Sequence, residues 1–251
     1  MNDSHEVQFQ PLLTPDWPAP ARVRAVSTTR QGGVSAPPYH ALNLAQHVGD
    51  EPACVLANRR WLAATLRYTH EPAWLEQVHG IQVVAAETVS APVPADAAWT
   101  RQIGQPCVVM TADCLPVLLC NQAGTVVAAA HAGWRGLASG ILAATVAQLH
   151  EAPTRLLAWL GPAIGPAAFE VGVEVRAAFL ALDAGNTVCF QPSPAGRWLA
   201  DLYALARRQL QGLGVRALYG GEHCTYSEPE RFFSYRRASR TGRMASLIWL
   251  E

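Results

Sequence analysis

Residues 107–136 form the stretch CVVMTADCLPVLLCNQAGTVVAAAHAGWRG, which contains three apolar runs in close succession. Its apolar runs have the length of buried strands, and a short polar or glycine-containing break follows each of them. The last two runs lie so close together that they predict a β-hairpin. The runs that we expect to form strands cover 107–110, 115–120 and 125–130.

The expected hairpin has a definite register. With a turn over 122–124, Leu115 lies opposite His131, and Cys114 becomes a close neighbour of His131. In a regular hairpin, however, side chains at 114 and 131 point to opposite faces. Pro116 and the polar break before it make the strand irregular here, so the sequence leaves open whether the two side chains meet.

Outside this stretch, strands and helices are mixed along the chain, and several strands are adjacent in sequence. This pattern favours an α+β fold or a mixed sheet over strict βαβ winding. The 251 residues contain neither a repeat nor a low-complexity linker, which predicts a single domain. The further strands are expected at 22–29, 81–86, 156–160, 215–219 and 244–250, and the helices at 52–67, 135–150, 173–182 and 198–213.

Composition excludes several classes of function. The 19 basic residues balance the 19 acidic ones, which argues against nucleic-acid or anionic-membrane partners bound through bulk charge. All basic residues are Arg, so chemistry that needs a Schiff-base lysine is excluded.

The six Cys residues show no paired spacing, which indicates reduced thiols and a cytoplasmic protein. The N-terminal residues lack an apolar stretch of signal-peptide type, and the longest apolar runs are interrupted by Asp113 and His131, so we expect no membrane partner.

Three side chains suit a metal ion: His79, Cys114 and His131. One thiolate and two imidazoles are ligands for zinc or copper. Their separations of 35 and 17 residues are longer than those of structural zinc fingers, and no fourth ligand is evident. The set therefore fits an open catalytic site, in which zinc lowers the pKa of water. Two alternatives remain: an ordinary packing role for all three, or a Cys114 nucleophile with His131 as its base.

Other polar residues are candidates for substrate contacts. Arg30 precedes two glycines and could hold phosphate or carboxylate through its fork, and Arg135 opens the helix after His131. Asn43 lies between two leucines and is either a binding residue or a turn residue. Asp113, beside Cys114, is either a general acid–base or a cap.

Together these segments resemble the YfiH/YlmD laccase-domain family, also called peptidoglycan editing factor PgeF or polyphenol oxidase. The resemblance runs from about residue 21 to the C-terminus, and the motifs occur in the family's order. They are STTRQGG (27–33), LNL (42–44), QVHG (77–80), ADA (95–97), TADCLPV (111–117), AHAGWRG (130–136), GPAIG (161–165) and FSYRR (233–237).

The resemblance implies an α+β fold of mixed sheets flanked by helices, related to the catalytic domain of cytotoxic necrotizing toxins. It implies one catalytic domain over 21–251, with 1–20 as an N-terminal extension. It also implies that His79, Cys114 and His131 are zinc ligands.

The activity that the resemblance implies is zinc-dependent purine nucleoside chemistry on a small-molecule substrate. It comprises phosphorolysis of adenosine, inosine, guanosine and methylthioadenosine, and deamination of adenosine. Phosphorolysis requires a phosphate site, for which Arg30 and Arg135 are the candidates. Deamination requires activated water, with Asp113 or another acid moving the proton.

Three other functions stay open as alternatives. Copper-dependent phenol oxidation would need many His ligands, and only two of the eight His lie in strong motifs, so Zn²⁺ is favoured over Cu²⁺. A peptidoglycan-precursor amidase could use the same Cys/His/zinc site. A non-enzymatic module with structural zinc would need a fourth protein ligand. The sequence does not determine the oligomeric state.

Overall fold

The structure of the protein is a computed structural model, and it describes residues 10–251. Its centre is a six-stranded sheet in the order β12-β8-β6-β7-β4-β3. Only β12 with β8 and β3 with β4 pair in parallel. The strands of this sheet are β3 (Val83–Ala85), β4 (Ala97–Thr100), β6 (Leu115–Asn121), β7 (Val127–Ala132), β8 (Leu156–Leu160) and β12 (Ala217–Gly220).

A second sheet of four strands has the order β1-β2-β13-β5 and is antiparallel throughout. It pairs the C-terminal strand with strands from the first half of the chain. Its strands are β1 (Leu12–Leu13), β2 (Val23–Thr28), β5 (Cys107–Thr111) and β13 (Met244–Leu250).

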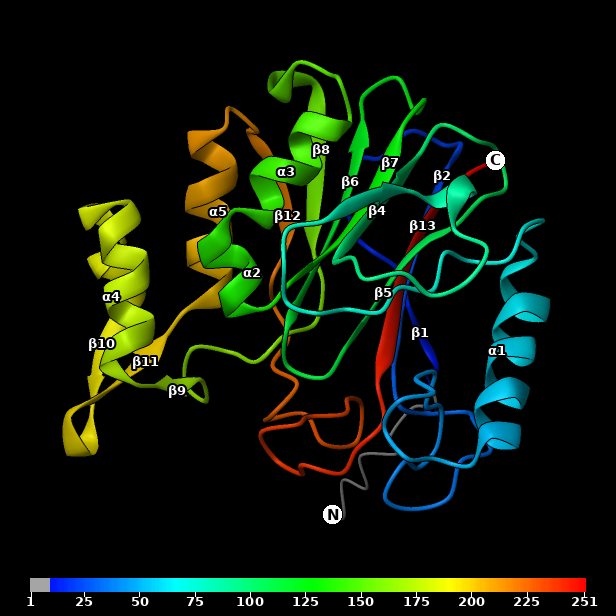
Figure 1. The fold of residues 1–251 in the computed structure, drawn as a ribbon, viewed down its shortest axis with the longest axis horizontal. Coiled ribbons are helices and arrows are strands. Elements are labelled where there is room, and N and C mark those ends of the chain that lie inside the picture. The colour runs from blue at the N-terminus through cyan, green and yellow to red at the C-terminus, as the bar shows by residue number, and fades with distance from the viewer. Residues whose placement is uncertain (1–9) are drawn as a thin grey trace, which may run out of the picture.

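The two sheets pack face to face, and helices cover both outer faces (Figure 1). Between the sheets lie alternate apolar residues from each, such as Val109 and Ile248 from one and Leu118 and Ala129 from the other. The opposite face of the six-stranded sheet packs against α2, α3 and α5. These helices are α2 (Trp134–Ser139), α3 (Ile141–Gln148) and α5 (Leu202–Gly212).

Helix α1 (Pro52–Leu66) covers the outer face of the four-stranded sheet together with the loop after β2. Pro52 stands at its first turn, where the fixed φ of proline suits a helix. The helix ends at Arg67, which has a φ of 56°. The mixture of helices and sheets confirms the expected α+β class.

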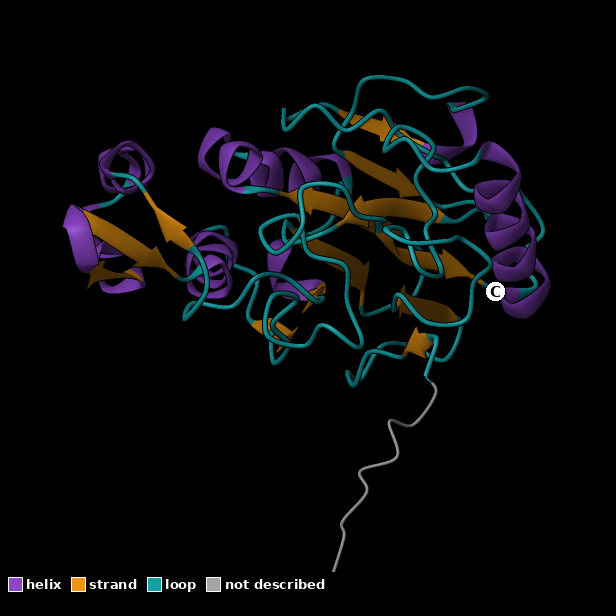
Figure 2. Ribbon diagram, turned by 90° about the horizontal axis from the view of Figure 1, so that it is seen from below, coloured by secondary structure: helices purple, strands orange, loops and turns teal. Residues whose placement is uncertain are grey.

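A smaller unit lies at one end of the molecule (Figure 2). It consists of α4 (Val173–Leu182) and the sheet β10-β11-β9, whose strands are β9 (Glu170–Val171), β10 (Phe190–Ser193) and β11 (Arg197–Ala200). Short 3₁₀ turns cover Ala86–Thr88, Pro153–Arg155, Ala184–Cys189 and Pro194–Gly196.

The hairpin of β6 and β7 forms, but the predicted register was wrong by one residue. His131 lies opposite Pro116 and not opposite Leu115. The turn is longer than expected because the side-chain oxygen of Asn121 accepts the backbone N–H groups of Thr125 (2.8 Å) and Val126 (3.3 Å). A shift of one residue moves every side chain of a strand to the other face. Cys114, two positions before Pro116, therefore lies on the same face as His131.

Two of the predicted helices have other bounds in the structure. The helix expected over 135–150 is divided into α2 and α3 at Gly140, whose φ of 100° ends the first helix. The helix expected over 198–213 begins only at Leu202, because Trp198 and Leu199 pair with β9 and β10.

Strand β1 lies within the segment expected to be an extension, and it pairs with β2. The division into 1–20 and 21–251 stays a prediction. Over residues 10–251, no helix combines the length and the apolar character needed to span a bilayer.

Candidate functional site

Three potential metal ligands meet at one end of the β6–β7 hairpin. His131 belongs to β7, Cys114 immediately precedes β6, and His79 comes from the loop before β3. Their donor atoms all lie within 4.8 Å of one another, and Cys114 Sγ is 3.7 Å from His79 Nε2. The structure thus brings together the Cys–His–His set that the sequence singled out.

The geometry of this set fits a tetrahedral metal ion. Zinc–nitrogen bonds of about 2.0 Å and zinc–sulfur bonds of about 2.3 Å hold neighbouring N and S donors about 3.5 Å apart. The observed separation of Sγ and Nε2 is close to that value. Within the part of the chain that the structure describes, this is the one cluster of three or more such ligands. Three protein donors leave a fourth position open, as in catalytic zinc sites.

Asp96, which lies in the ADA motif (95–97) but is not among the predicted site residues, holds both histidines in place. Its Oδ1 lies 2.8 Å from His131 Nδ1 and accepts the backbone N–H of His79 (2.9 Å). Its Oδ2 accepts the N–H groups of Gly80 (2.6 Å) and Val78 (3.3 Å). Because Nδ1 of His131 is bound to the carboxylate, Nε2 is the nitrogen available to a metal.

The charges of the site favour the metal-binding form of the thiol. Burial raises the pKa of Cys114, but the imidazoles of His131 and His79 outweigh it and lower that pKa to about 6. Burial lowers the pKa of His131, while the Cys114 thiolate and Asp96 raise it to about 9. Burial also raises the pKa of Asp96, yet its hydrogen bonds bring it below the ordinary value. At neutral pH these pKa values give a Cys114 thiolate, the form that binds metal, beside a His131 imidazolium, whose Nε2 proton a bound metal ion would displace.

Unusual backbone conformations occur at the site. His79 has a φ of 61° and Asp113 a φ of 93°. Non-glycine residues rarely adopt positive φ, and such residues cluster at functional sites because the surrounding structure holds them there. Here the Asp96 carboxylate holds the backbone around His79. The side chain of Asp113 accepts hydrogen bonds from Thr225 Oγ1 and from the N–H of Arg236, both at 2.6 Å.

Gly133, between β7 and α2, leaves no room for a side chain. A Cβ atom there would lie 2.8 Å from His79 Cδ2 and 3.0 Å from Cys114 Sγ. Its φ of −62° is one that alanine adopts easily, so only the lack of space is at issue. Gly133→Ala is therefore expected to displace the ligands and weaken binding of a metal ion by about tenfold or more, measured with Zn²⁺ as the probe by chelator competition.

The matched control is Gly212→Ala at the end of α5, where a Cβ meets nothing within 4 Å. This variant should keep the affinity for zinc of the original protein. Equal zinc affinities in both variants would show that the space beside Gly133 is not needed to place His79 and Cys114 for metal binding.

A cavity of about 600 Å³ opens above the three donors. Asp113 and Arg135, two of the predicted site residues, line it, and Arg135 is exposed. Its other notable side chains are aromatic and cationic: Trp134, Phe169, Tyr235, Arg236, Arg243 and His47. Trp134, Tyr235 and Arg236 lie within the AHAGWRG and FSYRR motifs of the sequence, whereas Phe169, Arg243 and His47 lie in none of its motifs.

Arg30 and Asn43 do not line this cavity. The guanidinium of Arg30 donates to the carbonyl oxygens of His40 and Pro229, both at 2.9 Å, and lies 5.0 Å from the centre of the Phe233 ring. Asn43 is fully buried. Both side chains hold loops near the site, and contact of either residue with a substrate stays a prediction.

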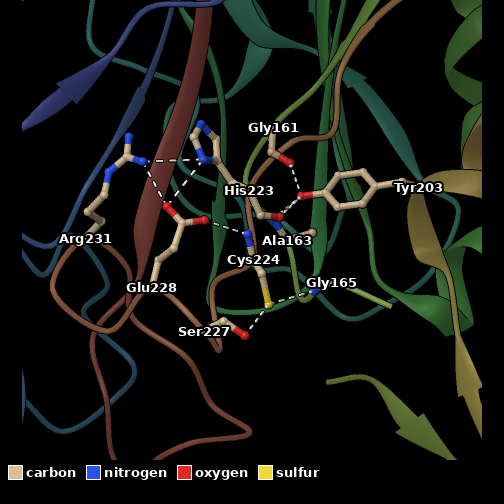
Figure 3. Close-up of polar contacts among 9 residues, drawn as sticks. All are labelled: Gly161, Ala163, Gly165, Tyr203, His223, Cys224, Ser227, Glu228 and Arg231. Carbon is tan, nitrogen blue, oxygen red and sulfur yellow. Dashed lines mark hydrogen bonds and ion pairs between the residues drawn. The ribbon is translucent and has the colours of Figure 1, made fainter. Parts of the chain in front are cut away.

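The wall of the cavity at Ile164 is fixed by a buried hydroxyl group, that of Tyr203. Tyr203 Oη, on α5, accepts the N–H of Ala163 (2.8 Å) and lies 2.8 Å from the carbonyl oxygen of His223 and 3.2 Å from that of Gly161 (Figure 3). It thereby ties the loop after β8 to the segment around 223–225. Thr225, in that segment, in turn holds Asp113.

Comparison with known proteins gives close relatives over nearly the whole chain. The chain is 58% identical to purine nucleoside phosphorylase PA4543 of Pseudomonas aeruginosa, over 95% of this chain and 98% of that protein. It is 55% identical to purine nucleoside phosphorylase YfiH of Escherichia coli, with the same coverage.

Solved structures agree with the sequence relatives. Neisseria meningitidis protein NMB0706 superposes with a TM-score of 0.94 at 50% identity, over 96% of this chain and 100% of that protein. YlmD of Geobacillus stearothermophilus gives 0.90 at 31% identity, over 96% and 97% of the two chains. A family model described as multi-copper polyphenol oxidoreductase laccase matches residues 24–251. The chain therefore belongs to this family, the YfiH family that its motifs indicated.

Proposed function

We propose that the protein is a zinc-dependent purine nucleoside phosphorylase. The observation that carries this proposal is the cluster of His79, Cys114 and His131 at the base of a large cavity. Relatives that are 58% and 55% identical bear the name purine nucleoside phosphorylase, which supports the same reaction here.

Zinc suits the donor set better than the copper in the family's description. His79, Cys114 and His131 would hold the ion, and zinc there would act as a Lewis acid. A laccase needs several coppers and many His ligands. Residues 10–251 contain a single Cys–His–His cluster, which supports one metal ion.

The remaining residues of the cavity suit a purine nucleoside. The rings of Trp134, Phe169 and Tyr235 line it, and a planar base stacks favourably on aromatic side chains. Asp113 is held by Thr225 and Arg236, so its carboxylate has a fixed position beside Cys114 from which it could orient a ribose hydroxyl or accept a proton. Arg135 is exposed at the cavity and could guide an anion into it.

The cell compartment that we infer is the cytoplasm. All six Cys residues are free thiols in the structure, and three of them are buried. Thiols remain reduced in the cytoplasm, whereas oxidising compartments favour disulfides. We assign the catalytic unit to residues 21–251.

The test is to incubate zinc-loaded protein with adenosine, with and without phosphate, and to identify the products by chromatography. We expect adenine and ribose 1-phosphate, formed only when phosphate is present. Inosine in both samples would instead show hydrolytic deamination. If neither product forms while zinc is bound, the proposal is refuted and a cell-wall-precursor amidase becomes the next candidate.

A further inference from the structure

The cavity above the metal ligands carries more positive than negative charge. Three guanidinium groups line it, those of Arg135, Arg236 and Arg243, whereas Asp113 is its single carboxylate. Both oxygens of Asp113 already accept hydrogen bonds. Over residues 10–251, none of the three guanidinium groups forms an ion pair with a carboxylate. A divalent cation at the three donors would increase the positive charge further.

Arg243 is the most firmly held of these three arginines. Its Nη1 donates to the carbonyl oxygens of Thr241 (2.9 Å) and Gly242 (3.1 Å). In the part of the chain that the structure describes, its Nε and Nη2 make no hydrogen bond. Neither atom is a fully buried donor without a partner, so both are accessible to a ligand. These two groups form one edge of the guanidinium fork, which is the edge that binds two oxygens of one anion.

The backbone of Arg243 is also fixed, and Asn43 fixes it. Asn43 Oδ1 accepts the N–H of Arg243 (2.9 Å), and its Nδ2 donates to Asp50 Oδ2 (2.9 Å) and to the carbonyl of Ala45 (3.1 Å). Asn43 is fully buried, so this arrangement is shielded from water. Asn43 thus acts as a positioning residue for Arg243.

The other two arginines are less suited to hold an anion deep in the cavity. Arg236 uses Nη1 to donate to the carbonyl of Glu170 (2.8 Å) and is exposed. Arg135 is exposed and stacks on its neighbour Trp134, with 4.5 Å from Cζ to the ring centre.

Burial lowers the pKa of Arg243, and the charges of Cys114 and Asp113 raise it only in part, because neither forms a close ion pair with the guanidinium. A half-buried cation without a close ion pair is costly unless a ligand supplies the negative charge.

We propose that Arg243 binds the phosphate co-substrate through the free edge of its guanidinium, and that Asn43 positions Arg243 for this task. This inference rests on the proposed phosphorylase function. In that reaction a phosphate oxygen forms a bond to ribose C1′ while the C1′–N9 bond breaks. The electron pair of that bond leaves with the purine, which takes up the proton that the attacking phosphate gives up. Arg243 holds the attacking phosphate, and Arg30 takes no part in its binding.

The first measurement is calorimetric titration of inorganic phosphate into zinc-loaded protein without nucleoside, so that no turnover is needed. In Arg243→Met, the Kd for phosphate is expected to rise by about 10–100-fold, because a two-point contact to an anion is lost. Arg243→Lys keeps the charge but not the fork, and its Kd should fall between the two. Arg60→Met, at an exposed arginine of α1, is the control and should change Kd by less than about twofold.

The second measurement is steady-state phosphorolysis of adenosine at varied phosphate. The KM for phosphate should rise in Arg243→Met by the same factor as Kd, with the KM for adenosine changed by less than about threefold. Unchanged phosphate binding in Arg243→Met would overturn the inference while leaving phosphorolysis intact. If phosphate binding depends on Arg243 but the original protein forms no ribose 1-phosphate, the proposed function is refuted and the role of Arg243 in binding phosphate stands. If Arg243→Met does not fold, Arg243→Lys carries the same comparison, and an unchanged KM for phosphate would overturn the inference.

Discussion

Replacing Cys114 with alanine is expected to abolish both metal retention and turnover. The variant removes the one thiolate of the three donors and leaves two imidazoles, which are too few for a stable zinc site. Zinc affinity should fall by more than about 100-fold, beyond the effect of changing outer-shell partners. Metal content after dialysis against a chelator and the rate of ribose 1-phosphate formation measure the two losses.

Cys54→Ala is the matched control, because Cys54 is a half-buried free thiol on α1. It should keep its zinc and its activity. Turnover by Cys114→Ala after loss of the metal would contradict the zinc mechanism. A variant that kept its zinc but lost turnover would support the other interpretation, in which Cys114 is the nucleophile.

Asp96→Asn is expected to have the second largest effect, although Asp96 does not contact the substrate cavity. Its carboxylate accepts hydrogen bonds from three backbone N–H groups, those of Val78, His79 and Gly80. The fourth group is Nδ1 of His131, which donates when it carries a proton. An asparagine offers one acceptor oxygen and one NH₂ group, and the NH₂ group would face donors. Zinc affinity should fall by about 10–100-fold, as for other partners of metal-bound histidine.

The same substitution should also lower the free energy of unfolding by about 1–3 kcal/mol, because buried donors lose their acceptor. Chemical denaturation and chelator competition measure the two effects separately. Asp183→Asn, an exposed carboxylate paired with Arg208 outside the site, is the control for loss of an acidic charge. If Asp96→Asn binds zinc as tightly as the original protein, Asp96 does not orient His131.

The hairpin shows how far local sequence reasoning can go. Its two strands were predicted from apolar runs, because burial of a strand requires several consecutive apolar residues. Its register was wrong by one residue, because Asn121 closes the turn with its side chain and no pattern of hydrophobicity contains that hydrogen bond. That single step decides whether Cys114 and His131 share a face.

The phosphate-binding residue that we propose, Arg243, also differs from the ones that the sequence predicted. The glycines after Arg30 indicate a phosphate contact, but its Nε and Nη1 donate to carbonyl groups of His40 and Pro229. Arg243 has no motif of its own. Its importance follows from the Asn43 and Thr241 groups that hold it and from the cavity that it faces.

Side-chain chemistry, apolar periodicity and motif order are local properties, so the class of fold, the family and the identity of the Cys–His–His set could be inferred from the residues alone. The shared face of Cys114 and His131, the contact of Asp96 with His131 and the place of Arg243 in the cavity became visible only in the folded chain. These relations depend on strand register and on hydrogen bonds between segments far apart in the chain, which folding brings together.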